Sequence, residues 1–229
     1  MRRQRRLAFP LMCGRFTLRT PAALVARQFE LPFAPDLQAR YNIAPRQPVA
    51  AVRLDPKGQR ELVFLRWGLV PAWADDPTIG YKMINARGET AATKPSFRQA
   101  FRTRRCLIPA DGFYEWRKSG RLKQPYHITL GADELFAFAG LWERWQRNGE
   151  PLETCTLLTT TANDELKPIH DRMPVILRPD AYAAWLDPQA AADALAALIQ
   201  PLPSGLLKLR PVSSFVNSPG HEGPQCLAP

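Results

Sequence analysis

The chain has 229 residues, of which 45% are hydrophobic, and a formal net charge of +10. This is enough apolar material for one full core, and no run reaches the roughly 18 consecutive apolar residues that a membrane-spanning helix needs. Residues 1–12 hold four arginines and no acids, so removing them lowers the charge from +10 to +6. A basic body favours polyanionic partners, nucleic acid first, although a basic enzyme without such a partner has the same composition.

The first half of the chain predicts short strands, one helix and one hairpin. Cys13–Arg19 alternates like a strand, and Thr20 with Pro21 marks the start of a helix. Residues 40–48 are expected to form an ordered loop. The turn sequence Asp55-Pro56-Lys57-Gly58 between two strand-like runs predicts a hairpin.

The second half is richer in strands. Loop and helix are expected over 85–105, with Ser96 as a helix cap. Strands are expected at 106–109, 113–117, 126–130, 135–145, 154–161, 173–177 and 206–212, and helices at 163–168 and at 180–200, the latter interrupted at Pro188. Many antiparallel strands with few separate helices predict a single α+β domain, with a curved, mostly antiparallel sheet or an open β-barrel core flanked by helices. The tail, 217–229, is expected to be flexible.

The cysteines and histidines limit the chemistry. The four cysteines show no disulfide-framework spacing, which fits a reducing cytoplasm. No His, Cys and carboxylate residues have metal-ligand spacing, so no metal or other cofactor is expected. Of the three histidines, His127 is interpreted as packing or surface and His221 as without a role. His170 begins a polar turn that leads into an apolar strand, where it is either functional or structural.

Cys13 follows Met12 directly. If the chain begins at Met12, or if a leader is removed, Cys13 becomes the N-terminus. Its α-amine would then have a pKa near 7.7–8.0 and could attack a carbonyl at neutral pH, after which the thiol could close a thiazolidine ring. The alternative is a small core cysteine at a strand start.

Two further motifs have both a functional and a structural reading. Glu115 lies in an aromatic strand-like run, where a carboxyl group either gains a raised pKa and shuttles protons or faces solvent. Tryptophans such as Trp67 either stack unpaired bases or belong to the core.

Six segments together resemble the SRAP family, the SOS response-associated peptidases or abasic-site processing proteins. In chain order they are Cys13-Gly14-Arg15-Phe16, Tyr41-Asn42-Ile43-Ala44-Pro45, Arg66-Trp67-Gly68-Leu69, Asn85-Ala86-Arg87-Gly88-Glu89-Thr90, Pro109-Ala110-Asp111-Gly112-Phe113-Tyr114-Glu115-Trp116 and Ile169-His170-Asp171-Arg172-Met173-Pro174. Each segment is modest alone, but six in register are highly specific. They span nearly the whole chain from Cys13 onward.

The resemblance implies an SRAP-like domain at 13–216 with a DNA groove, which captures abasic sites of single-stranded DNA covalently during the DNA damage (SOS) response. The family's nucleophile falls on Cys13, its positioning amide on Asn85, its proton-transfer acid on Glu115 and its histidine on His170. DNA-contact positions fall on Arg15, Asn42, Trp67 and Arg87, and Thr159 is assigned to the same set. The expected protein is a monomer without membrane attachment, cytoplasmic and associated with the nucleoid when bound to DNA.

Residues 1–12 depart from the family pattern, in which cysteine is exposed once the initiator Met is lost. They are either the product of a start assigned too far upstream, which we favour, or a pro-segment removed by self-cleavage. The rival functions are a thiol peptidase acting on other proteins, with Cys13, His170 and Asn85 as its machinery, and a passive single-strand-binding module.

Overall fold

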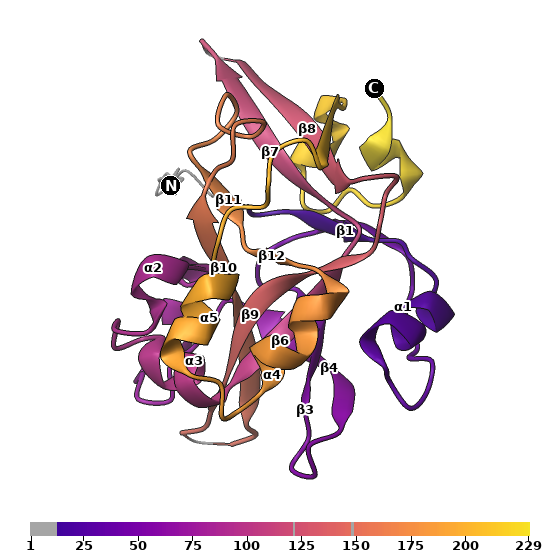
Figure 1. Cartoon of the computed structure of the whole chain (residues 1–229). Coiled ribbons are helices and arrows are strands. Elements are labelled where there is room, and N and C mark those ends of the chain that lie inside the picture. Colours follow the sequence, from indigo (N-terminus) through magenta and orange to yellow (C-terminus); the bar gives the residue numbers. More distant parts are fainter. Residues whose placement is uncertain (1–12, 121, 148) are drawn as a thin grey trace.

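The computed structural model describes residues 13–120, 122–147 and 149–229 (Figure 1). Its centre is a ring of five strands, in the order β10–β4–β3–β6–β9 and back to β10. These strands are β3 (Pro48–Leu54), β4 (Arg60–Trp67), β6 (Arg105–Ala110), β9 (Phe136–Trp145) and β10 (Leu152–Thr161). The β4–β10 pairing is parallel, and the other pairings in the ring are antiparallel. The ring is therefore a closed barrel.

A second sheet of five strands lies beside the barrel, in the order β13-β8-β7-β1-β2. Its members are β1 (Phe16–Leu18), β2 (Arg40–Ile43), β7 (Gly112–Ser119), β8 (Leu122–Leu130) and β13 (Leu207–Pro211). The long β7–β8 hairpin projects away from the barrel in Figure 1. Three short strands extend the barrel sheet, namely β5 (Asn85–Arg87), β11 (Arg172–Pro174) and β12 (Ile176–Leu177).

Short helices flank these sheets. The α-helices are α1 (Ala22–Phe29), α2 (Gly88–Ala91), α3 (Arg98–Thr103), α4 (Tyr182–Leu186) and α5 (Ala192–Leu198). The 3-10 helices are η1 (Pro77–Lys82), η2 (Pro179–Ala181), η3 (Ser214–Asn217) and η4 (Pro224–Leu227). Within the described part of the chain, none of these helices is long and apolar enough to cross a membrane.

Aromatic side chains join β1 to the barrel. Phe16 is 1% exposed, and its ring meets those of Trp67 and Phe138 edge to face at 5.3 and 5.6 Å between centroids. Phe138 also contacts Phe113 of β7 at 6.1 Å. Edge-to-face pairs of this kind stabilise a core by about 0.5–1.5 kcal/mol beyond their buried area. The start of β1, and with it Cys13, is thus fixed against the barrel.

The α+β class, the mostly antiparallel sheet and the flanking helices are confirmed. Three local expectations were wrong. The loop expected at 40–48 begins with β2, whose backbone pairs with β1. Ser96 does not cap α3, because the helix begins after Phe97 without a side-chain cap. Residues 163–168 form hydrogen-bonded turns around Asn163, whose Oδ1 accepts from the Leu166 backbone, rather than a helix.

The C-terminus also differs from the flexible tail expected at 217–229. There the Glu222 carboxylate accepts hydrogen bonds from the backbone N–H groups of Tyr41 and Asn42, at 2.5 and 3.1 Å. Cys226 of η4 is fully buried. A carboxylate that satisfies the backbone donors of β2 anchors this stretch to the second sheet. Residues 213–229 are called the C-terminal segment below.

Candidate active site and DNA groove

The backbone nitrogen of Cys13 meets a buried carboxyl group. The antiparallel β1–β7 register, with Phe16 opposite Phe113, brings the residues before Phe16 beside those after Phe113. The Cys13 N–H donates to Glu115 Oε1 at 2.6 Å, and Cys13 has a left-handed φ of 39°. Left-handed conformation in a residue other than glycine is unusual and clusters at functional sites.

Glu115 is 2% exposed, and this burial raises its pKa to about 8. The backbone N–H groups of Cys13 and Trp116 oppose the rise, and Asp171 adds to it. Burial, followed by the nearby Glu115, also raises the pKa of the Cys13 thiol. Near neutral pH the site therefore holds a protonated carboxyl and a neutral thiol.

His170 lies in the turn before β11 and lines the same groove as Glu115. Its Nδ1 accepts a hydrogen bond from the Arg172 backbone at 3.1 Å and lies 3.0 Å from Asp171 Oδ1. Burial, with Lys118 and Arg172, lowers the pKa of His170 against the effect of Asp171. A neutral imidazole has one donor and one acceptor nitrogen, so His170 can exchange a hydrogen bond or a proton with a ligand oxygen.

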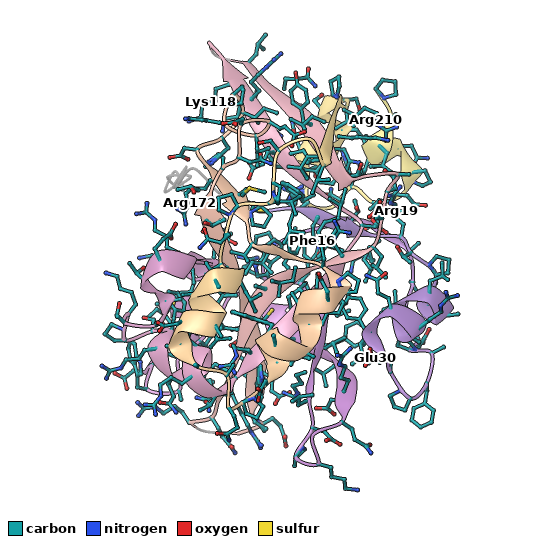
Figure 2. All side chains as sticks on the ribbon, viewed as in Figure 1. Phe16, Arg19, Glu30, Lys118, Arg172 and Arg210 are labelled. Carbon is teal, nitrogen blue, oxygen red and sulfur yellow. The ribbon has the colours of Figure 1, made fainter. Side chains whose placement is uncertain are left out.

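The groove above these groups has a volume of about 880 Å³. Its cations come from the residue before β1, from the turn after β2 and from the β7–β8 hairpin: Arg15, Arg46, Lys118 and Lys123. Figure 2 shows Lys118 on the projecting hairpin. Trp116, Pro168 and Pro219 add apolar surface. Such a mixture of cations and apolar or aromatic walls suits a single nucleic acid strand.

Arg15 lies in the groove, but the protein already uses several of its donors. Its Nη1 donates to Asn42 Oδ1 and to the Val216 carbonyl, both at 2.8 Å, and its Nη2 donates to the Asn217 carbonyl at 3.2 Å. Asn42 is fully buried, and its amide donates to the carbonyls of Val216, Ser218 and His221. The structure therefore does not support a direct DNA contact for Asn42, which instead holds the C-terminal segment.

Trp67 and Thr159 are likewise interior. Trp67 is 1% exposed, and its Nε1 donates to the Ile84 carbonyl at 2.8 Å. Thr159 is fully buried, with its Oγ1 directed to the Ala86 carbonyl at 3.4 Å. Neither side chain can reach a DNA strand in this conformation. Trp67 instead supports the site, because it packs on Phe16 and fixes the residue that precedes Asn85.

Asn85 and Arg87 lie on β5, which runs parallel to β10 in register with Leu157 and Thr159. The side chain of Arg87 is exposed at the end of this strand, while Asn85 is half-buried. Neither residue lines the groove described above. The structure thus brings Cys13, Glu115, His170 and Arg15 to one place and leaves the β5 pair at its side.

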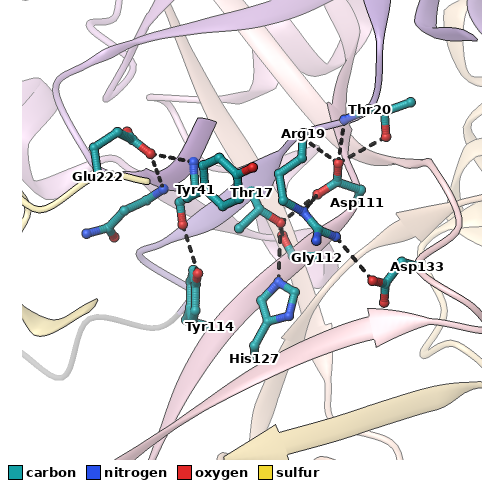
Figure 3. Close-up of polar contacts among 11 residues, drawn as sticks. Thr17, Arg19, Thr20, Tyr41, Asp111, Gly112, Tyr114, His127, Asp133 and Glu222 are labelled. Atoms are coloured by element: carbon teal, nitrogen blue, oxygen red, sulfur yellow. Dashed lines mark hydrogen bonds and ion pairs between the residues drawn. The ribbon is translucent and has the colours of Figure 1, made fainter. Parts of the chain in front are cut away.

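Asp111 is a residue whose role the sequence reasoning missed. Its carboxylate, 2% exposed, accepts from Thr17 Oγ1 at 2.7 Å and from the backbone N–H groups of Arg19 and Thr20 at 2.5 and 2.8 Å (Figure 3). Burial alone would raise its pKa, but these bonds and the Arg19 guanidinium lower it. Asp111 thus anchors the end of β1. His127, 2% exposed with Nε2 3.3 Å from Thr17 Oγ1, packs behind it, which confirms its structural interpretation.

The groove cations Arg46, Lys118 and Lys123 were also missed. The two lysines flank the β7–β8 turn, so a basic turn beside the motif that contains Glu115 was the available signal. Among the described residues, no group of three or more His, Cys, Asp or Glu side chains is arranged to hold a metal ion.

Comparison with known proteins gives concordant matches in sequence and structure. The sequence model of the family described as SOS response associated peptidase (SRAP) matches residues 12–219. The abasic site processing protein YoaM of Bacillus subtilis (strain 168) is 46% identical over 222 residues, covering 94% of this chain and 97% of that protein. The abasic site processing protein YedK of Escherichia coli (strain K12) is 31% identical, covering 95% of this chain and 100% of that protein. A crystal structure of a Bacteroides thetaiotaomicron protein superimposes with a TM-score of 0.83 at 26% identity, covering 94% of this chain and 98% of that one.

Proposed function

Because the chain belongs to the SOS response associated peptidase (SRAP) family, whose relatives above are abasic site processing proteins, we propose that it captures abasic sites in single-stranded DNA. The product is a thiazolidine between Cys13, as N-terminal residue, and the sugar aldehyde. This chemistry belongs to the response to DNA damage. It takes place where chromosomal DNA is found, in the cytoplasm and on the nucleoid.

The observation that carries the proposal is the 2.6 Å contact between the Cys13 nitrogen and the buried Glu115 carboxyl. In the chain that continues back through Met12 this nitrogen is an amide and cannot attack a carbonyl. Once Cys13 is the first residue, the same atom is an α-amine with a proton carrier already in hydrogen-bond range.

The first step joins this amine to the C1′ aldehyde of the ring-opened abasic sugar. The nitrogen lone pair forms the N–C1′ bond, the carbonyl π electrons move to the oxygen, and one amine proton passes to that oxygen to give a hydroxyl group. Glu115, whose burial favours its protonated form, gives its proton to that hydroxyl, which leaves as water, and takes up the remaining amine proton in return. The remaining imine carries the N=C1′ bond.

The second step closes the ring. The Cys13 sulfur attacks C1′ of the imine, and the thiol proton passes to the imine nitrogen, so that S–H adds across the double bond. A thiol with a raised pKa arrives neutral and can supply this proton itself. His170, whose lowered pKa favours its neutral form, serves the sugar oxygens and assists β-elimination or reversal. Asn85 holds the opened sugar from the side of β5.

A single strand suits the groove better than a duplex. The Glu115 carboxyl is 2% exposed, so the sugar must enter the protein to meet it. In a duplex, enzymes that act on one nucleotide must first extrude it, at the expense of unstacking. A single strand enters without that penalty, while the groove cations neutralise its phosphates.

The site also bears on the rival activity, a thiol peptidase acting on other proteins. Such an enzyme needs a thiolate, and thiolates form where the cysteine pKa is lowered. Burial and Glu115 raise the pKa of Cys13, which disfavours that chemistry. The only proteolytic event that the proposal needs is the one that exposes Cys13: removal of Met12 if the chain starts there, or self-cleavage of residues 1–12, which lie outside the described residues.

The test is incubation with single-stranded DNA that carries one abasic site, followed by a denaturing gel. The wild type should give a heat-stable complex, and Cys13→Ala should give none. Cys13→Ala and Cys13→Ser both keep the α-amine but lack the thiol, so each should form only an imine, which heating reverses and borohydride traps. Cys106→Ala, a fully buried thiol of β6, is the matched control and should react normally.

Acetylation of the α-amine with the thiol left free separates the candidate functions. Loss of the complex is expected, because the amine starts the reaction. An unchanged yield after acetylation, or an unchanged yield in Cys13→Ala, would refute the proposal. Salt-sensitive, noncovalent complexes alone would instead indicate a passive binding module.

A further inference from the structure

The turn after β2 holds a cation in a strained conformation. Arg46 has a left-handed φ of 72°, which residues other than glycine rarely adopt. Its N–H donates to the Trp67 carbonyl at 2.8 Å, and the Gln47 N–H donates to the Ala44 carbonyl at 3.3 Å. The turn is therefore fixed on both sides of Arg46. Strain of this kind persists where the surrounding structure enforces it, often beside a ligand site.

An aromatic ring fixes the side chain of Arg46 as well. The guanidinium carbon lies 4.9 Å from the ring centroid of Tyr81, which belongs to η1 and is 51% exposed. The residue before it, Gly80, packs directly on Gly68, so that a Cβ atom at Gly80 would lie 2.5 Å from the Gly68 carbonyl oxygen. This close backbone contact determines the position of Tyr81. The stack thus orients the Arg46 guanidinium before any ligand arrives.

Arg46 and Arg15 both line the groove, but they differ in how far their N–H donors are already used within the protein. Arg15 donates to Asn42 and to two carbonyls of the C-terminal segment. Arg46 is exposed, and within the described part of the chain no carboxylate forms an ion pair with it. A planar guanidinium held on an aromatic face can present two N–H groups to one phosphate.

We infer that Arg46 and Tyr81 form a second contact point for the DNA strand, outside the abasic nucleotide. The Arg46 guanidinium binds a backbone phosphate of a flanking nucleotide, and the exposed surface of Tyr81 stacks on the neighbouring base. This inference rests on the proposed function, in that the captured abasic sugar sets the register of the strand. The contact would determine how much intact strand beside the lesion the protein requires.

The experiment measures the affinity of the full chain for fluorescein-labelled single strands with one abasic site, by anisotropy before crosslinking proceeds. Three variants are compared: Arg46→Gly, Tyr81→Ala and the control Lys57→Ala, an exposed cation of the β3–β4 turn outside the groove. Glycine accepts the left-handed φ, so Arg46→Gly should fold at least as stably as the wild type.

Arg46→Gly and Tyr81→Ala should each weaken binding roughly tenfold, and Arg46→Gly should reduce the dependence of log K on log[salt] by about 0.7, as for one phosphate on a single strand. Shortening the strand on one side of the lesion should abolish the difference between variant and wild type, while shortening the other side should not. Lys57→Ala should bind as the wild type.

Wild-type affinity in both variants would overturn the inference, and so would a loss that persists when both flanks are removed. These outcomes are distinguishable from failure of the proposed function. If the proposed function fails, the wild type gives no covalent complex with abasic DNA, whatever the affinities of the Arg46 and Tyr81 variants.

Discussion

Replacing Glu115 by glutamine should stabilise the protein while it impairs capture. Burial raises the pKa of Glu115 from its ordinary 4.5 to about 8, so the folded protein holds this proton more tightly than the unfolded chain. The unfolded state releases it above about pH 4.5, and wild-type stability should therefore fall as the pH rises from there to about 8. Glutamine does not titrate, so the variant lacks this loss.

The magnitude follows from the same values. Each tenfold change in proton affinity corresponds to about 1.36 kcal/mol, which sets a ceiling of about 5 kcal/mol on the advantage of Glu115→Gln above pH 8. Structural relaxation and water entry reduce it, so about 2–4 kcal/mol is expected at pH 8.5 and almost none at pH 4.5. Capture by the variant should be slower by about 10²–10⁴-fold, the usual contribution of general acid–base catalysis.

The assay is urea unfolding followed by tryptophan fluorescence between pH 4.5 and 8.5, with single-turnover capture rates beside it. Glu150→Gln, an exposed acid, is the control and should retain the wild-type pH dependence. The protein that begins at Cys13 should show a smaller pH effect than the chain with residues 1–12, because a protonated α-amine would lower the pKa of Glu115. A pH-independent difference between Glu115→Gln and wild type, together with normal capture, would refute the assigned role.

His170→Ala should alter release or β-elimination more than capture, measured by chasing a labelled complex with unlabelled abasic DNA; equal effects on both rates would contradict the division of roles. Protein made from the native locus should have the intact mass of a chain that starts at Cys13, and a stable Met1 form would show that the α-amine is absent. Glu222→Gln should weaken DNA binding several-fold, because Glu222 fixes a groove wall through Tyr41 and Asn42. The rate at which bound complexes crosslink should change little. An unchanged affinity would show that the C-terminal segment does not contribute to DNA binding.

Hydrophobic alternation and turn residues predicted most of the fold. The Asp55-Pro56-Lys57-Gly58 hairpin and the helix after Pro21 were predictable because their signals are local. The closure of the barrel was not, since the parallel β4–β10 pairing joins segments far apart in sequence and has no local signature. The ordered C-terminal segment was missed for a related reason. Its order depends on contacts with Arg15 and Asn42, not on its own composition.

For the candidate site too, the sequence predicted some features and missed others. Sequence motifs pointed to Cys13, Glu115 and His170, and the structure brings Glu115 to the Cys13 nitrogen and His170 to the same groove. Motifs cannot separate residues that touch a ligand from residues that hold the site together. Asn42 and Trp67 were predicted as DNA contacts for that reason, whereas their burial and bonds place them in the supporting structure.

The closed barrel has a consequence for the order in which the protein becomes reactive. Adjacent pairs such as β3–β4 and β7–β8 form from nearby segments, whereas the parallel β4–β10 pairing needs a long loop to close and should form late. Phe16 packs on Trp67 of β4 and Phe138 of β9, so the chain next to Cys13 is immobilised only after that step. If Cys13 is the N-terminal residue, as proposed, a nascent or misfolded copy would present its amine and thiol without the Glu115 carboxyl beside them. Under the proposed function, slow closure of the barrel thus limits acid-assisted aldehyde capture to molecules that have finished folding.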